Sequence, residues 1–169
     1  MKFFSDKKAL TLLEVIVAIG LIVSGLIGTL ALITQSTKDI RGADNRLIAA
    51  NLAQEAIEVV VAIRDSNWIN ENTWTNNIRL TQRGIVDYNG ASVQEVSSSR
   101  FCLLRNASGY YIHGTQATCN TIFSRHLEIS DGTDANGNVY REIRAVVEWP
   151  EGNNTKGVTV VEHLYNWYE

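Results

Sequence analysis

The chain has 169 residues, of which 45% are hydrophobic and 20% charged, with a formal net charge of -3 at pH 7. This slightly acidic balance provides no basic patch for a nucleic acid. Once the N-terminal segments described below are set aside, roughly 105 residues remain from Ser66 onward, enough for one small domain with its own core but not for two.

The N-terminus begins with a short basic leader, residues 1–9, which carries three lysines against one aspartate and ends at the small residue Ala9. An uncharged apolar run follows from Val15 to Ile33. At about 1.5 Å per residue in a helix it spans roughly 30 Å, the thickness of a bilayer's hydrocarbon core. The lysines ahead of this transmembrane segment predict a cytoplasmic leader and a C-terminal domain on the outer side.

Glu14 stands at the start of that run, where a buried charge costs about 2 to 4 kcal/mol unless it has a partner. The nearest cations in the sequence are Lys7 and Lys8. A secretory signal peptide and a permanent signal anchor are the two plain interpretations of this region. A secretory signal has about 7 to 15 apolar residues before an Ala-x-Ala-like site. The present apolar run is longer, and the residues at its end, 30–36, contain no such site. Neither a secretory signal nor a plain anchor explains Glu14.

Together these features resemble the class III signal of type IV pilins and type II secretion pseudopilins. The order is the family's: a basic leader, a small residue at Ala9, an apolar residue at Leu10, and a glutamate, Glu14, five residues into the mature chain. The family usually carries Gly-Phe at the cut, where this chain has Ala-Leu. The segment 11–15, Thr-Leu-Leu-Glu-Val, and the absence of proline from the helix are closest to minor pilins and minor pseudopilins.

The resemblance implies that a prepilin peptidase cuts after Ala9 and methylates the new α-amine of Leu10. Removal of the leader leaves a net charge near -5. The chain is then a substrate of enzymes and not itself an enzyme, because no phosphate loop, nucleophile elbow or framed carboxylate pair is present. We expect no cofactor.

Small residues recur every four positions inside the apolar run and therefore share one helix face, where they permit close helix contact: Gly20, Ser24 and Gly28. The alternative is that glycine is simply common in membrane helices.

Beyond Ile33 the apolar residues become periodic with helical spacing, at Ile40, Ala43, Leu47, Ala50, Ile57 and Val60 or Val61. The sequence therefore predicts one helix over 10–65, roughly 80 Å long. A coiled coil is the alternative for the distal half, but strict heptads are not sustained. Such a helix requires a head packed against its distal half.

Strand-like patterns begin after an Asn- and Trp-rich connection over 67–77. Asn89-Gly90 predicts a tight hairpin between 85–88 and 91–96, and 106–109 predicts a second hairpin between 101–105 and 110–113. A loop over 130–138 separates strands 123–129 and 139–149, and a last strand covers 157–167. Within 139–149 an alternating apolar set predicts a half-buried strand: Ile143, Ala145, Val147 and Trp149. The predicted fold class is therefore α+β, with the long helix packed on an antiparallel sheet head over 66–169, as the pilin resemblance also implies.

The head contains two cysteines, Cys102 and Cys119, on the predicted outer side of the membrane. A disulfide is the simplest inference, and it would stabilise the head by about 3 kcal/mol. A metal site that includes His113 and His126 is the alternative, but it lacks the paired spacing of zinc motifs, so we assign no metal ligand. Alternating oxygen donors over 131–138 leave calcium open, because a polar hairpin loop has the same composition.

The resemblance predicts a structural subunit of a type IV pilus-like fibre, a minor pilin, held in register by Glu14 paired with a neighbour's N-terminal amine. A type II secretion pseudopilin or, less in keeping with Glu14, a stand-alone membrane-anchored binding protein are the alternatives. Expected partners are sister subunits, the prepilin peptidase, and an inner-membrane assembly platform with its ATPase. The expected location is the inner membrane, single pass, and then an extracellular or periplasmic fibre.

Overall fold

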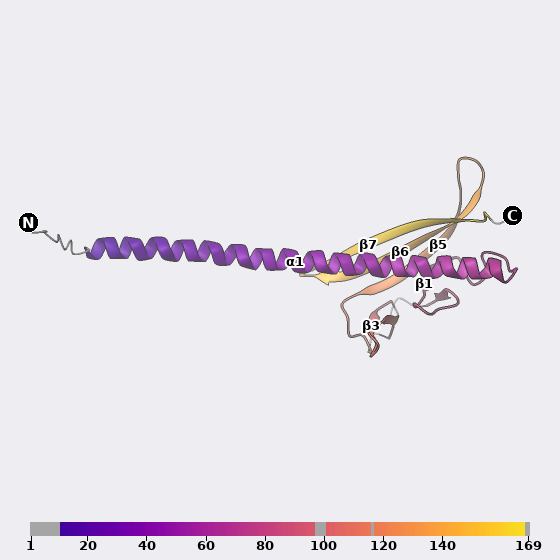
Figure 1. Cartoon of the computed structure of the whole chain (residues 1–169), viewed down its shortest axis with the longest axis horizontal. Helices are drawn as coiled ribbons and strands as arrows, with labels where there is room; N and C mark the ends of the chain where they lie inside the picture. Colours follow the sequence, from indigo (N-terminus) through magenta and orange to yellow (C-terminus); the bar gives the residue numbers. More distant parts are fainter. Residues whose placement is uncertain (1–10, 97–100, 116, 168–169) are drawn as a thin grey trace, which may run out of the picture. The chain divides into compact units, whose positions relative to one another are not determined.

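The computed structural model describes residues 11–96, 101–115 and 117–167. It divides into two compact units, one ending at Gly42 and one beginning at Ala43, and a single helix, α1 (Leu12–Ile69), runs through both. The second unit combines the distal part of α1 with an antiparallel sheet (Figure 1). This arrangement confirms the α+β class and the prediction of a long N-terminal helix packed on a β-rich head.

Helix α1 continues four residues beyond the predicted end near Asp65 and closes at Ile69. The N–H of Asn72 donates to the carbonyl oxygen of Asn67 (2.8 Å), and the N–H of Glu71 donates to that of Trp68 (3.0 Å). These two bonds form a Schellman cap, which needs its C′ residue in the left-handed region. Glu71 occupies that position with φ 56°, where glycine is the usual residue.

Replacing Glu71 with glycine should therefore stabilise the head, because glycine adopts the left-handed conformation without the steric cost of a Cβ. We expect the free energy of unfolding to rise by about 1 kcal/mol. Urea unfolding of the full chain in detergent, followed by tryptophan fluorescence, measures it. A Glu71→Ala variant, which keeps the Cβ, is the control and should stay near wild type; equal stability of all three chains would mean that Glu71 is not strained.

The main sheet has five strands in the order β2-β1-β5-β6-β7, and every neighbouring pair is antiparallel. Its members are β1 (Thr81–Ile85), β2 (Gln94–Glu95), β5 (Ser124–Thr133), β6 (Val139–Glu151) and β7 (Asn154–Tyr165). The last strand begins and ends earlier than the predicted 157–167. A two-residue turn joins β6 to β7 at Gly152 and Asn153, and Gly152 supplies the positive φ (63°) that such a turn requires.

The core lies between α1 and one face of this sheet. Strand β6 contributes the alternating set that the sequence predicts, with Ile143, Ala145, Val147 and Trp149 all buried. Helix α1 contributes a face in which alanines lie among larger aliphatic residues: Ala49, Leu52, Ala53, Ala56, Ile57, Val60 and Ile63. Small alanines let the helix backbone approach the sheet. Ile40 and Leu47, which the periodicity also selected, are instead exposed.

The predicted tight hairpin at Asn89-Gly90 is wrong in its register. Strands β1 and β2 do pair, with Gly84 opposite Glu95 and Ile85 opposite Gln94, but residues 86–93 form a wide loop between them. The loop is held by contacts outside the hairpin. The Arg125 side chain, on β5, donates to the carbonyl oxygen of Val86 (2.9 Å). The backbone just after Ile85 is therefore bonded to β5 and not to β2.

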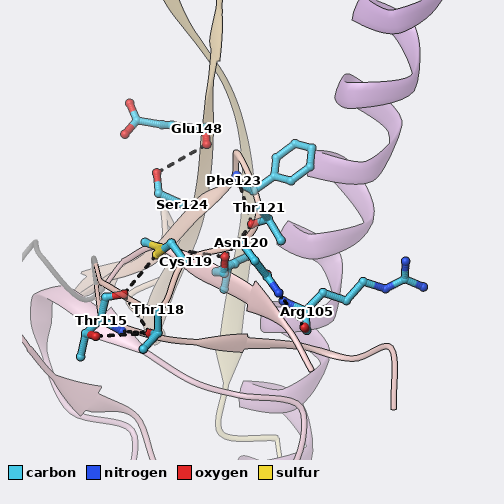
Figure 2. Close-up of a disulfide and its surroundings, with 11 residues drawn as sticks. Arg105, Thr115, Thr118, Cys119, Asn120, Thr121, Phe123, Ser124 and Glu148 are labelled. Atoms are coloured by element: carbon cyan, nitrogen blue, oxygen red, sulfur yellow. Dashed lines mark hydrogen bonds between the residues drawn. A yellow bond between two sulfur atoms is a disulfide. The ribbon is translucent and has the colours of Figure 1, made fainter. Parts of the chain in front are cut away.

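The second predicted hairpin is present as β3 (Leu103–Arg105) and β4 (Tyr111–His113), which form a separate two-stranded sheet. A disulfide joins Cys102 and Cys119, whose Cα atoms are 6.2 Å apart. Beside it the Asn120 side chain accepts from the Arg105 N–H (2.7 Å) and donates to the Arg105 carbonyl (3.0 Å), as a neighbouring strand would (Figure 2). The disulfide therefore covalently links the two ends of the hairpin segment, residues 102–119. The Asn120 amide makes the two hydrogen bonds to Arg105 that a neighbouring strand would otherwise make.

The predicted loop over 130–138 is too long, because β5 continues to Thr133 and only 134–138 turn. Two side chains of β6 explain the extension. Arg141 makes a two-pronged ion pair with Asp131 (2.8 and 3.2 Å), and the Tyr140 ring lies against Gly132, where a Cβ would collide with it. Polar residues that resemble a loop in sequence are thus held in the sheet by cross-strand partners.

Candidate functional site

In the first unit, α1 presents an apolar surface that no other described residue covers. Every leucine, isoleucine and valine between Leu12 and Ile33 is exposed. By length and composition, α1 is the one helix among the described residues that could cross a membrane. Side chains of this kind need lipid or other helices around them, so this surface is the candidate assembly site.

Glu14 lies in the first turn of this helix. The side-chain oxygen of Thr11 accepts a hydrogen bond from the Glu14 N–H (3.3 Å), so Thr11 is the N-cap. Thr11 and Glu14 have the Thr-x-x-Glu spacing of a capping box, a local role that the sequence reasoning missed although both residues were quoted. Among the described residues the Glu14 carboxylate has no cationic partner.

The three small residues Gly20, Ser24 and Gly28 all lie in this exposed part of α1. A Cβ added at either glycine would meet nothing within 4 Å, so no part of the described chain fills the space beside them. The Ser24 hydroxyl donates to the Leu21 carbonyl (2.9 Å). Thr29, Thr34 and Thr37 likewise donate to carbonyls of the preceding turn, bonds that would satisfy their hydroxyls in lipid. The predicted cleavage and methylation positions, Ala9 and Leu10, lie outside the described residues.

In the second unit, a buried arginine ties helix and sheet together. Arg125, on β5, has a side chain that is 1% exposed. Its Nη1 donates to the Leu52 carbonyl (3.0 Å) and to Oε1 of Glu55 (2.8 Å), both on α1. Its Nη2 donates to Val86, whereas its buried Nε has no partner among the described residues. One side chain thus connects α1, β5 and the β1–β2 loop.

Replacing Arg125 with alanine should destabilise the head by about 3 kcal/mol, because it removes a buried charge whose partners are then left unpaired. Arg144→Ala is the matched control: Arg144 lies on the neighbouring strand and pairs with Glu128 (3.0 Å), but it is 44% exposed. That variant should cost less than about 1 kcal/mol. Urea unfolding of both variants measures the difference, and equal costs would refute the role given to Arg125.

A second polar contact lies next to Arg125. The Nδ1 atom of His113 is 2.6 Å from Oδ1 of Asp87, and its Nε2 is 3.0 Å from the Arg125 carbonyl oxygen. Both neighbours are acceptors, so either ring nitrogen can donate a hydrogen bond to the oxygen beside it when it carries the proton. The His113 N–H also donates to Asp87 (2.9 Å). Burial raises the pKa of Asp87, but the hydrogen bonds and charge of His113 outweigh it and hold that pKa below its usual range.

Because the folded state lowers the pKa of Asp87, this carboxylate stabilises the head fully above its ordinary pKa of 3.8, and the stabilisation is lost as the pH falls through the lower folded value. Asp87→Asn should therefore lose less stability than wild type when the pH is lowered from about 5 to 2. Unfolding midpoints of both chains across that range test this. Parallel curves would show that Asp87 does not contribute to the acid dependence.

The residues considered for metal ions do not converge on a site. His113 has both ring nitrogens hydrogen-bonded, and His126 stacks on Phe101 with ring centres 4.6 Å apart.

In the turn over 134–138, the Asp134 carboxylate accepts from the N–H groups of Asn136 (2.9 Å) and Asn138 (2.8 Å). The Asn138 amide, which also donates to Asp134, is the main cause that lowers the pKa of that carboxyl. Across the described ranges no group of three or more His, Cys, Asp or Glu side chains could hold a metal.

Comparisons of the chain with protein-family models, with curated proteins and with solved structures return no match. The residues and their geometry are therefore the basis of the functional argument.

Proposed function

We propose that the chain is a structural subunit of a type IV pilus-like fibre, a minor pilin, and that residues 15–33 anchor it in the membrane before assembly. One observation carries the proposal: a carboxylate, Glu14, heads an uncharged helix surface whose large aliphatic side chains are all exposed. Such a surface suits contact with sister helices, and such a charge requires a cation within that contact.

The cation would be the α-amine of Leu10 on a neighbouring subunit, created when a prepilin peptidase removes residues 1–9. Pairing makes both charges tolerable in an apolar bundle. It also sets the axial register, because a subunit displaced by one turn would leave two unpaired buried charges, at a cost of several kcal/mol.

The open space beside Gly20, Ser24 and Gly28 would accept a neighbouring helix at close range. Leaving lipid for a helix bundle yields little net hydrophobic gain, because lipid is as apolar as the bundle. Assembly therefore needs external work, which by the pilin resemblance comes from the platform and its cytoplasmic ATPase. The head, on the outer side, determines what the fibre contacts.

A secretion pseudopilus would use the same helix surface and the same charge pair, and Thr11 to Val15 suit both fibres. A stand-alone anchor has no use for Glu14. Recovery of the protein in fibres sheared from the cell surface favours the pilus, and its retention in the envelope with a secretion defect favours the pseudopilus.

Glu14 variants test the proposal and separate the charge pair from the capping box. Glu14→Gln removes the charge but keeps a side chain that can complete the box, and Glu14→Val removes both. We expect each to be processed normally, yet to be at least about tenfold scarcer in fibres, since breaking a buried pair costs about 3 to 5 kcal/mol. Quantitative immunoblots of fibre and membrane fractions measure the ratio.

Thr11→Ala is the matched control, because it removes the N-cap hydroxyl and keeps the charge; it should enter fibres near the wild-type level. The proposal fails if Glu14→Gln assembles like wild type. A defect confined to Glu14→Val and Thr11→Ala would assign Glu14 to helix capping instead.

A further inference from the structure

A cavity of about 460 Å³ lies at the C-terminal end of α1, between that helix, the connection after it and the β1–β2 loop. Among the residues that the structure describes, none of those that line it is charged, although 20% of the chain is charged. Apolar side chains of α1, including Val59 and Ile63, form one part of the lining. The remainder is mainly carboxamide, together with one aromatic ring: Asn67, Asn70, Asn72, Asn77, Asn89 and Tyr88.

Three of these amides are available to a ligand. The side chains of Asn72, Asn77 and Asn89 are exposed and form no hydrogen bond in the part of the chain that the structure describes. Each carboxamide offers two N–H donors and one oxygen acceptor. They come from two different segments, so they border the cavity from more than one side.

Hydrogen bonds fix the segment of the lining that carries Asn72 and Asn77. Asn67, only 5% exposed, donates through Nδ2 to the carbonyls of Trp74 (3.2 Å) and Asn76 (2.6 Å). The Asn77 carbonyl accepts from the Val93 N–H (2.9 Å), which connects this wall to the β1–β2 loop. Glu71 and Asn77, the non-glycine residues with positive φ in the described ranges, both lie in this connection. Strained backbone of this kind persists where the surroundings fix it, often at binding sites.

The aromatic ring is also fixed. Tyr88 stacks on Tyr110 with ring centres 4.5 Å apart and planes 17° apart, and it keeps 39% of its surface exposed. A rigid ring beside preset amides is a common way to bind an amphipathic small molecule, with polar groups that fix its orientation.

We propose that this cavity is a binding site for a neutral carbohydrate. A sugar presents many hydroxyls, each a donor and an acceptor, which match the free carboxamides, and its C–H faces suit the tyrosine ring and the aliphatic side chains of α1. The absence of charge from the described part of the lining argues against an anionic sugar, a phosphate or a metal ion, each of which needs a charged partner. The inference does not rest on the proposed fibre role.

Saturation-transfer NMR on the full chain tests the proposal, in a zwitterionic detergent without a sugar headgroup, since a maltoside would itself present the ligand. The probes are glucose, galactose, mannose and N-acetylglucosamine, with glucuronate and a blocked alanine tripeptide as comparisons. We expect transfer to at least one neutral sugar and weaker transfer to glucuronate. Transfer to none of the four neutral sugars, or to the tripeptide alone, would overturn the proposal.

Variants locate the site. Asn72→Ala combined with Asn77→Gly removes two amides while glycine preserves the positive φ at 77, and Asn89→Ala changes the other segment alone. Each should weaken binding of the positive sugar about tenfold or more. Asn136→Ala, in the exposed β5–β6 turn, is the control and should bind as wild type. Wild-type affinity in Asn89→Ala with unchanged circular dichroism would refute the site, and fibre entry of these variants, measured separately, should not change.

Discussion

An uncharged helix surface headed by a single carboxylate is the constraint on which the rest of this molecule depends. From Leu12 to Ile33 the large aliphatic side chains are all exposed, and Glu14 has no cation among the described residues. The exposed apolar surface is unfavourable in water, and the unpaired carboxylate is costly in lipid. The single chain is therefore an incomplete structure, and its completion by lipid, sister helices and a cation is what the proposed function describes.

The same helix has a second and different task beyond Gly42. There it carries small buried residues such as Ala49, Ala53 and Ala56, which bring its backbone close to the sheet, and Arg125 reaches across to the Leu52 carbonyl. A long isolated helix is marginal without such packing. The head thus stabilises the distal part of the helix, whereas the apolar surface of the N-terminal part stays exposed.

Much of the fold follows from patterns that are local in sequence. The alternation of β6 from Ile143 to Trp149 and the length of the apolar run each depend on one element, and both predictions agree with the structure. The burial of Arg125 was also predictable from its strand, because Arg125 lies on the same face as Phe123 and Leu127, but it was not predicted. The capping role of Thr11 was also readable from its spacing to Glu14.

The failures come from contacts between elements far apart in the chain. Asn89-Gly90 is a strong local turn signal, yet the hairpin is wide because Val86 and Asp87 are bound by Arg125 and His113. Glu71 closes α1 where no glycine marks the end. The uncharged cavity could not be read from the sequence either, because its asparagines are brought together only when the helix end meets the β1–β2 loop.

In the proposed fibre, Glu14 has a cationic partner only if Leu10 carries a free amine. Intact-mass analysis of the protein purified from its native membrane or fibre is the most direct test. The expected result is a chain that begins at Leu10, carries one added methyl group, and has Cys102 joined to Cys119. A chain that still carries residues before Leu10, in cells whose prepilin peptidase is active on other substrates, would contradict it.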